Sequence, residues 1–224
     1  MPPPPPASIR NEVILPLRFD DGYATSARLL TFDGLVDGRE HLALGLGDRA
    51  APFAEAQPLH LPPLVRPHSE CLTGDVFGSE RCDCGPQLRE AVERIADVGG
   101  YLLYLRQEGR GIGLYSKLDA YVLQDAGLDT YEANVALGHG EDERDYAVAA
   151  QMLLALGQAT VTLLSNNPDK ARQLRACGVT VEDQLPTGVH LSPANARYLA
   201  AKARWAGHTL DLTPAAPGSP GDRR

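Results

Sequence analysis

The chain has 224 residues, of which 43% are hydrophobic and 22% are charged. This composition and length are enough for a buried core, which excludes a chain that is disordered throughout. The net charge of −8 excludes a general polyphosphate-binding surface, so nucleic acid is not an expected partner and any anionic ligand must be held by local groups.

Prolines are concentrated at the two ends of the chain, with five in residues 2–6 and three in residues 214–220. We therefore expect residues 1–10 and 214–224 to be disordered and residues 11–213 to form a single domain. The richest apolar window, 152–164, is too short and too interrupted for a membrane span, and the first residues lack the features of a signal peptide. The expected protein is soluble and cytoplasmic, with no membrane partner.

The first part of the chain has the pattern of an antiparallel meander. Residues 13–17, 23–32 and 41–46 are short and partly alternating, and Asp-Gly pairs lie between or beside them. The rhythm then changes, because Leu88, Val92 and Ile95 have helical spacing, residues 101–105 form an apolar strand, and helical spacing returns at residues 114–122.

The second half repeats this alternation of helix and strand. It predicts a helix over 142–156, a strand over 160–164, and a helix that begins at Asn167 and Pro168, where Asn can cap and Pro suits the first turn. Residues 179–181 can add a strand, and Ser192 opens a last helix that Gly207 closes. The expected fold class is α+β (mixed α/β), in which helices pack against a mixed, mainly antiparallel sheet in one domain.

Three of the four cysteines, Cys71, Cys82 and Cys84, form a C-x10-C-x-C cluster. Disulfides are not expected in a cytosolic chain, and flanking glycines let the thiolates converge on one soft divalent cation, for which zinc is the natural candidate. Three protein ligands leave a position for water, as in catalytic zinc sites. Cys177 or His68 could supply a fourth ligand, although Cys177 is equally explained as a small buried residue.

Two further segments suggest anion binding. Residues 106–114 place Arg106, Glu108 and Arg110 among glycines between an apolar strand and a helix, although a solvated turn would explain the same letters. Ser165 and Lys170 follow the strand over 160–164, where they could reach a phosphate or merely belong to a well-capped helix.

These segments together resemble the GTP cyclohydrolase II family. The resemblance covers residues 13–210 and rests on six motifs in the family's order: R-x-H-S-E-C-L-T-G-D from Arg66, R-C-D-C-G from Arg81, R-Q-E-G-R-G-I-G-L from Arg106, E-A-N from Glu132, D-E-R-D-Y from Asp142 and N-N-P-x-K from Asn166. The family's bifunctional relatives carry a dihydroxybutanone phosphate synthase domain ahead of this one, for which the chain has no room, so the resemblance is to the monofunctional form.

The resemblance implies a zinc-dependent hydrolase that opens the imidazole ring of GTP at C8. Formate and pyrophosphate would leave, and a phosphoribosylamino diaminopyrimidine would remain, in the first step of riboflavin biosynthesis. It also implies a homodimer and Mg²⁺ bound with the GTP phosphates. Two alternatives stay open: ring opening that stops at the formamidopyrimidine, and a GTP-binding regulator without catalysis.

The resemblance also assigns roles to individual residues. Cys71, Cys82 and Cys84 would hold zinc, Asp142 would be the proton acceptor, and Arg144 the nucleophile toward the α-phosphate, with Tyr121 an active-site tyrosine. The substrate contacts would be Arg66, His68, Ser69, Glu70, Gln87, Glu108, Gly109, Arg110, Thr130, Ser165 and Lys170. Because arginine is a poor nucleophile, Arg144 could instead act only through its charge. Glu70 or Glu108 would read the guanine edge.

Two residues depart from the family pattern. Ser165 stands where the family usually has Thr, and it keeps the hydroxyl. Pro67 stands where the family usually has a β-branched residue, and it removes a backbone donor that could otherwise contact the substrate.

Overall fold

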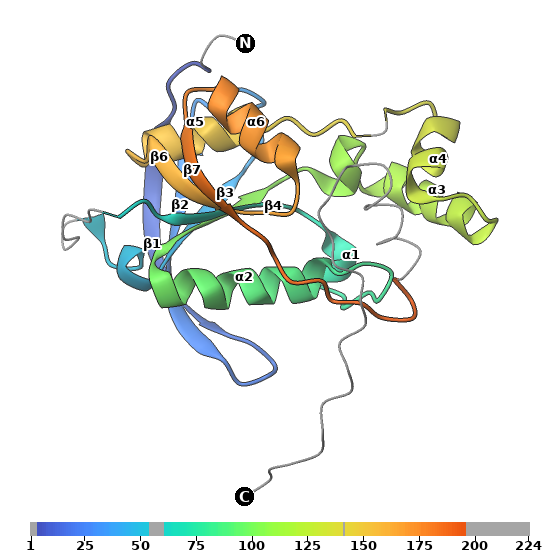
Figure 1. Cartoon of the computed structure of the whole chain (residues 1–224), viewed down its shortest axis with the longest axis horizontal. Coiled ribbons are helices and arrows are strands. Elements are labelled where there is room, and N and C mark those ends of the chain that lie inside the picture. Colours follow the sequence, from blue (N-terminus) through green and yellow to red (C-terminus); the bar gives the residue numbers. More distant parts are fainter. Residues whose placement is uncertain (1–3, 54–60, 141, 196–224) are drawn as a thin grey trace, which may run out of the picture.

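The computed structural model describes residues 4–53, 61–140 and 142–195 of the chain (Figure 1). Its strands are β1 (Ser8–Arg18), β2 (Ala24–Asp33), β3 (Leu42–Leu46), β4 (Leu64–Ser69), β5 (Gly100–Leu105), β6 (Thr160–Leu164) and β7 (Thr180–Leu185). Its α-helices are α1 (Leu72–Asp75), α2 (Cys84–Val98), α3 (Leu114–Asp125), α4 (Thr130–Ala136), α5 (Ala147–Ala155) and α6 (Pro168–Ala176), with 3-10 turns at η1 (Gly47–Arg49) and η3 (Glu108–Gly111).

All seven strands belong to one sheet, in the order β1-β2-β3-β5-β4-β6-β7. The pairs from β1 to β5 along this order are antiparallel, and the pairs from β5 to β7 are parallel. The predicted single mixed α/β domain is therefore confirmed. The sheet is not mainly antiparallel as expected, because three described pairings are antiparallel and three are parallel.

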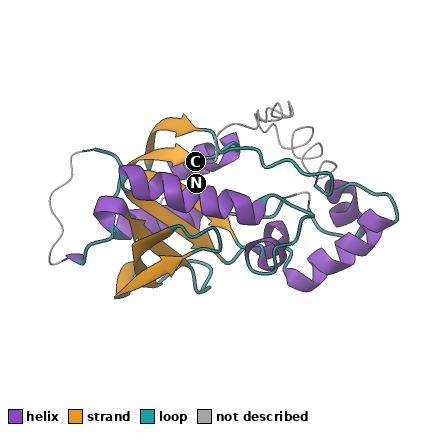
Figure 2. Cartoon of the chain, turned by 90° about the horizontal axis from the view of Figure 1, so that it is seen from below, coloured by secondary structure: helices purple, strands orange, loops and turns teal. Residues whose placement is uncertain are grey.

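Helices cover both faces of the sheet, with α2 on one side and α5 and α6 on the other (Figures 1 and 2). Strand β5 shows how this arrangement follows from its sequence, because side chains alternate along a strand. Tyr101 and Leu103 are buried with the residues of α5 and α6, whereas Leu102 is buried with Ile95 of α2. Successive side chains of β5 therefore pack alternately into the core on one face of the sheet and the core on the other face.

The parallel half of the sheet determines where the residues of the six motifs can meet. Helix α2 connects β4 to β5 on one face, while the connection from β5 to β6 passes through α5 on the other face. Strands β5 and β6 therefore lie on either side of β4 and are reached by connections on opposite faces of the sheet, and a crevice is expected beside the carboxyl ends of such strands. Helices α3 and α4 lie beyond this edge (Figure 1).

Most of the predicted elements are present. The strands expected at 13–17, 23–32, 41–46, 101–105 and 160–164 correspond to β1, β2, β3, β5 and β6, and α6 begins at Pro168 after an Asn167 cap. Strand β4 was not predicted, because Arg66, Pro67 and His68 interrupt its apolar pattern although all three are buried.

Two boundaries were predicted wrongly. The helix expected from Asp142 begins at Ala147, because the backbone N–H of Glu143 bonds Arg110 and that of Arg144 bonds the Asp142 side chain. The ordered part also begins before residue 11, since residues 8–10 lie in β1, where Ser8 is opposite Asp33.

The rest of the predicted terminal structure is outside the described residues. This concerns the remainder of the helix expected from Ser192 to Gly207 and the disordered tail expected at 214–224. Within the described part of the chain, no helix is long and apolar enough to cross a membrane.

Candidate active site

A pocket opens at the carboxyl edge of β4, β5 and β6, and it gathers residues from all of the segments that the motifs span. Sixteen of the seventeen predicted site residues line it, namely Arg66, His68, Ser69, Glu70, Cys71, Cys82, Cys84, Gln87, Glu108, Gly109, Arg110, Tyr121, Thr130, Arg144, Ser165 and Lys170. The remaining one, Asp142, contacts the lining residue Arg144.

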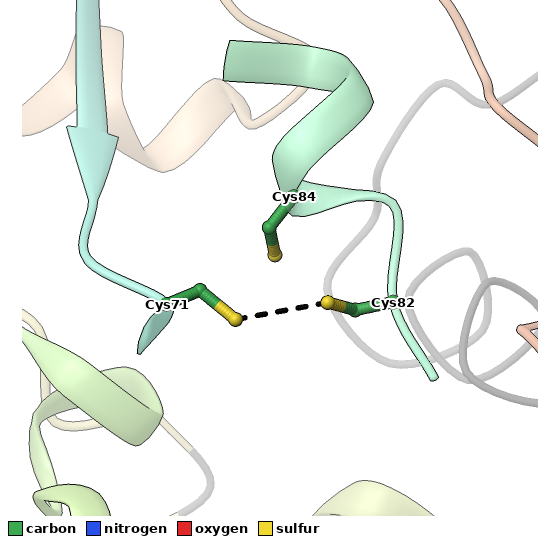
Figure 3. A group of neighbouring side chains, drawn as sticks. All are labelled: Cys71, Cys82 and Cys84. Atoms are coloured by element: carbon green, nitrogen blue, oxygen red, sulfur yellow. Dashed lines mark hydrogen bonds between the residues drawn. The ribbon is translucent and has the colours of Figure 1, made fainter. Parts of the chain in front are cut away.

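The three clustered cysteines converge on one another in the lining of the pocket (Figure 3). Cys71 precedes α1, Cys82 lies in the following loop, and Cys84 is the first residue of α2. Their sulfur atoms all lie within 4.8 Å of one another, and the Cys71 and Cys82 sulfurs are 3.6 Å apart. A Cβ on Gly74 would lie 2.7 Å from the Cys82 sulfur, so glycine is required for this approach.

The electrostatics of the cluster fit a bound cation. Hydrogen bonds from Cys82 and Cys84, together with the Lys117 ammonium, lower the pKa of the Cys71 thiol well below its ordinary value. The hydrogen bond with the Cys71 sulfur raises the pKa of Cys82 to about 11, and burial and repulsion from the Cys71 thiolate act in the same direction. A soft dication relieves this repulsion, and three convergent thiolates are a donor set that zinc accepts.

Neither candidate for a fourth ligand joins the group. Cys177 lies just after α6, is fully buried and packs with the core residues of that helix and α5, which confirms the packing interpretation. The Nε2 atom of His68 bonds the Asp75 carboxylate at 3.2 Å instead. Among the described residues, the group of potential metal ligands consists of the three cysteines.

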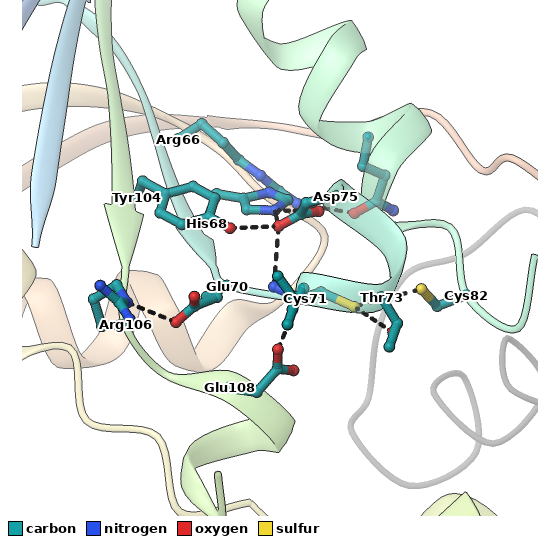
Figure 4. A network of polar contacts seen from close by, with 12 residues as sticks. Arg66, His68, Glu70, Cys71, Thr73, Asp75, Cys82, Tyr104, Arg106 and Glu108 are labelled. Carbon is teal, nitrogen blue, oxygen red and sulfur yellow. Dashed lines mark hydrogen bonds and ion pairs between the residues drawn. The ribbon is translucent and has the colours of Figure 1, made fainter. Parts of the chain in front are cut away.

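The Asp75 carboxylate joins several residues around Cys71 by hydrogen bonds (Figure 4). Its Oδ2 atom accepts hydrogen bonds from the Cys71 backbone N–H at 3.0 Å and from the Tyr104 hydroxyl at 2.9 Å, and it also faces His68 Nε2. Burial and the neighbouring Asp75 charge raise the pKa of Tyr104, so its hydroxyl remains a donor at neutral pH. One buried carboxylate therefore holds both the backbone of Cys71 and the side chain of His68, a predicted substrate residue.

On the side of Cys71 away from Asp75, the Glu108 carboxylate also accepts several hydrogen bonds from the protein (Figure 4). Its Oε2 atom accepts the Leu72 N–H at 2.7 Å, and its Oε1 atom accepts the Gly109 N–H at 3.0 Å and the Lys117 ammonium at 2.8 Å. By contrast, Glu70 accepts from Arg106 Nε at 2.8 Å. Glu108 thus ties the loop after β5 to the start of α1.

The loop after β5 has an unusual backbone. Gly109 and Arg110 have φ values of 61° and 62°, and a left-handed conformation is strained for arginine. The loop is stabilised by the neighbouring segment, because the Arg110 carbonyl accepts the Glu143 N–H at 3.0 Å. Gly111 permits this contact, since a Cβ there would lie 3.1 Å from the Glu143 backbone. The guanidinium of Arg110 lies 4.0 Å from the centre of the Tyr131 ring.

Asp142 and Arg144 form an ion pair with two parallel hydrogen bonds. Arg144 Nε donates to Asp142 Oδ1 at 2.8 Å, and Arg144 Nη2 donates to Asp142 Oδ2. Burial alone would raise the pKa of Asp142, but the hydrogen bonds and charge of Arg144 outweigh it and lower the pKa below its ordinary value. Asp142 is therefore ionised at neutral pH.

The segment after β6 supplies a buried cation. Lys170 is in α6, and its ammonium donates to the carbonyl of Pro67 at 2.7 Å. Ser165 accepts the Asn167 N–H through its hydroxyl oxygen at 3.1 Å. Pro67, which departs from the family pattern, thus holds Lys170 through its backbone carbonyl, an acceptor that proline retains.

Next to this segment, Arg66 donates to the Leu164 carbonyl at 3.2 Å and to Gln87 Oε1 at 2.9 Å. These contacts fix two predicted substrate residues in relation to each other. Thr130 begins α4, where Asp129 forms a capping box with Glu132.

Sequence reasoning missed Lys117, Asp75 and Gln107 as members of the site. Lys117 lies four residues before Tyr121, which places both on one face of α3 and is a signal that helical spacing could have provided. Asp75 closes the first motif. Gln107 lies within the third motif and donates to the Asp145 carbonyl, which only the fold brings near.

A comparison with protein families decides the class of this site. The model of the family described as GTP cyclohydrolase II matches residues 13–186. The chain belongs to the GTP cyclohydrolase II family. The predicted resemblance is confirmed, and membership of the GTP cyclohydrolase II family makes the chain an enzyme of the hydrolase class.

Individual relatives agree with this membership. A GTP cyclohydrolase-2 of Aliivibrio salmonicida is 50% identical over 186 residues, which are 83% of this chain and 89% of the relative. A GTP cyclohydrolase-2 of Vibrio cholerae is 50% identical over 83% of this chain and 90% of its own length. The riboflavin biosynthesis protein RibBA of Bacillus subtilis is 48% identical over 90% of this chain, but only 48% of that longer protein is covered.

Proposed function

We propose that this chain is a zinc-dependent GTP cyclohydrolase II that acts in riboflavin biosynthesis. It opens the imidazole ring of GTP at C8 and releases formate and pyrophosphate. The observation that carries the proposal is the arrangement of one pocket, in which three convergent cysteine sulfurs face the same space as Arg110, Arg144 and Lys170. A metal-assisted attack on the base and a cationic site for phosphates then serve one substrate. The names of the relatives support the choice of GTP.

Cys71, Cys82 and Cys84 would hold the metal. Zinc in such a site lowers the pKa of a bound water from ~15.7 toward ~7, which provides the nucleophile that the poorly electrophilic C8 needs. The chain's own contribution is orientation: the Tyr121 hydroxyl lies 3.4 Å from Thr73 Oγ1, beside the cysteines. Burial raises the pKa of Tyr121, so this hydroxyl stays protonated and can donate a hydrogen bond to the opening ring.

The phosphates would lie toward the cationic residues. Arg110, Lys170 and the Ser165 hydroxyl bind and orient the triphosphate, with Mg²⁺ sharing the charge of the departing pyrophosphate. Arginine suits this role because its planar guanidinium donates two parallel hydrogen bonds to a phosphate.

Arg144 would act at the α-phosphorus, with Asp142 as its partner. The covalent hypothesis makes Arg144 the nucleophile and Asp142 the acceptor of its proton. That transfer opposes the pKa order of the two groups, because an arginine has a pKa above ~12 and the pKa of Asp142 is lowered. The ion pair therefore favours the hypothesis that Arg144 stabilises charge in the transition state. Quenching single turnovers with labelled GTP tests this, since a guanylyl adduct on Arg144 would establish the covalent route.

Guanine recognition falls to Glu70 more readily than to Glu108. Three protein donors already occupy the Glu108 carboxylate, whereas Arg106 is the donor to Glu70. We expect Glu70→Gln to reduce the preference for GTP over ATP. A Glu108→Gln variant that alone lost this preference would reverse the assignment.

The proposed enzyme is a homodimer with an active site in each protomer. Exposed apolar side chains on α3 and α4 support an association, since Tyr115 and Val122 of α3 are 82% and 69% exposed and Val135 of α4 is 56% exposed. Sedimentation equilibrium at micromolar concentration tests this, and a single monomeric species would exclude it.

One assay separates the proposed reaction from its alternatives. Zinc-loaded protein is incubated with GTP and Mg²⁺, and formate, pyrophosphate and the pyrimidine product are quantified together by mass spectrometry. Equimolar amounts of the three are expected. A formyl-bearing product without formate would indicate arrested ring opening, and unchanged GTP would indicate a regulator without catalysis.

A further inference from the structure

We propose that Lys117 is a positioning and charge-balancing residue of the thiolate centre, acting on the metal site through Cys71. The proposal rests on the zinc site argued above, and it assigns a role to a residue outside the motif positions matched to substrate or metal. Lys117 is in α3, and only 8% of it is exposed.

All three hydrogens of the Lys117 ammonium have an acceptor. The nitrogen lies 3.1 Å from the Cys71 sulfur, 3.0 Å from Thr73 Oγ1 and 2.8 Å from Glu108 Oε1. These acceptors come from two separate parts of the chain, the region around α1 and the loop after β5. One amine thus joins a metal-binding thiolate to the loop that carries predicted substrate contacts.

The charges of the site explain why a cation is needed at this point. Three thiolates around a divalent cation leave one excess negative charge, and the Glu108 carboxylate adds another close by. A buried negative charge without compensation is costly, whereas the ammonium offsets one charge and donates a strong hydrogen bond to the sulfur. Partners that hold a metal ligand from outside typically change metal affinity by about 10- to 100-fold when removed.

The geometry also links the metal end to Tyr121. Lys117 and Tyr121 are one helical turn apart, and the ammonium lies 5.7 Å from the centre of the Tyr121 ring. Both side chains contact the Thr73 hydroxyl, at 3.0 Å and 3.4 Å. A displaced Lys117 would therefore disturb the thiolate, the tyrosine and the Glu108 loop together.

The test compares the full-length parent with Lys117→Met by two measurements that do not depend on turnover. The first is the zinc dissociation constant, measured by competition with a chromophoric chelator. The second is the sulfur-to-cobalt charge-transfer band of the cobalt-substituted protein. We expect Lys117→Met to bind zinc at least about tenfold more weakly. We also expect its band to move to longer wavelength, because a sulfur without the hydrogen bond gives up an electron more easily.

Two further variants provide the controls. Lys117→Arg keeps the charge and should recover much of the zinc affinity. Arg81→Met removes a different cation, whose guanidinium lies 4.8 Å from the Tyr121 ring centre, and should leave the cobalt band unchanged. A shift of equal size in Arg81→Met would assign the effect to general charge rather than to the contact with Cys71, and it would overturn the proposal.

A double variant keeps the test decisive if Lys117→Met does not fold. Lys117→Met with Glu108→Gln removes both charges of the buried pair, and its reference is Glu108→Gln alone. Equal zinc affinity and an unchanged cobalt band in the folded variant and its reference would overturn the role of Lys117. If the parent itself binds no zinc, the proposed function fails instead, so the two failures are distinguishable.

Discussion

Two groups of residues at the pocket, which we call the thiolate end and the arginine end, are built differently. At the thiolate end, Cys71 and Cys84 adjoin helices, and the carboxylates of Asp75 and Glu108 each receive several hydrogen bonds from the protein. At the arginine end, Asp142 and Arg144 lie in an irregular segment between α4 and α5, and 32% of the Asp142 side chain is exposed.

This difference suits two kinds of chemistry. A metal needs ligands at defined positions before the substrate arrives, and rigid elements with satisfied partners provide them. A triphosphate is flexible, and residues on a loop can adjust to it. The two ends are nevertheless connected, because the loop after β5 contacts both, through Glu108 at one end and through the Arg110 carbonyl at the other.

The largest expected effect comes from removing a thiolate. Cys82→Ser should lose stoichiometric zinc and at least about a thousandfold in turnover, because in the proposed reaction the nucleophile for C8 depends on the metal. Zinc content by atomic absorption and formate release measure the two losses. Cys177→Ala is the matched control, since it removes a buried cysteine of the core. Full turnover by a zinc-free Cys82→Ser protein would contradict the metal site.

The arginine end should fail without loss of the metal. Arg144→Ala is expected to lower turnover by about 100-fold, comparable to the removal of one charge-stabilising donor, with zinc content unchanged. Arg144→Lys should recover only part of this, because an ammonium cannot make the paired hydrogen bonds seen with Asp142. Zinc loss in Arg144→Ala would show that the two ends are not independent.

Asp75 tests whether the thiolate end depends on its supporting carboxylate. Asp75→Asn replaces an oxygen that accepts from the Cys71 N–H and the Tyr104 hydroxyl, so we expect a loss of about 1–3 kcal/mol in the free energy of unfolding. Zinc affinity should fall by about tenfold. Urea denaturation and chelator competition measure these changes. An unaltered Asp75→Asn protein would mean that this support is dispensable.

The smallest effect is the pH dependence of the Asp142–Arg144 pair. Because Arg144 lowers the pKa of Asp142 in the folded protein, the stabilisation is present above the unfolded pKa of ~3.9 and is lost as the pH falls through the lower folded value. We expect the stability difference between the parent and Asp142→Asn to be within about 1 kcal/mol and constant from pH 7 to pH 5. A difference that disappeared within this range would refute the assigned direction.

Local patterns were sufficient for much of this molecule. Partial alternation predicted β2, a continuous apolar run predicted β5, and an Asn-Pro pair predicted the start of α6, because these signals depend only on neighbouring residues. The cysteine spacing identified a candidate metal site, and the glycine-rich segment identified a candidate anion site. Both signals are also local, because they depend on residue types close together in the sequence.

Other features depended on partners far away in the chain. The start of α5 at Ala147 could not be read locally, because the backbone of Glu143 bonds Arg110, which is distant in sequence. Strand β4 was not predicted for a related reason, since its buried residues have distant partners: the Pro67 carbonyl accepts from the Lys170 ammonium, and Arg66 donates to the Leu164 carbonyl.

The sequence by itself determined the residue types of the site, the order of the motifs and the family to which they belong. The tertiary structure alone decided which residues are in contact. It places the Lys117 ammonium against the Cys71 sulfur and the Glu108 carboxylate, and it packs Cys177 in the core. The physical reason is that side-chain chemistry is a local property. Proximity is created by the parallel strands, which bring the ends of β4, β5 and β6 to one edge of the sheet.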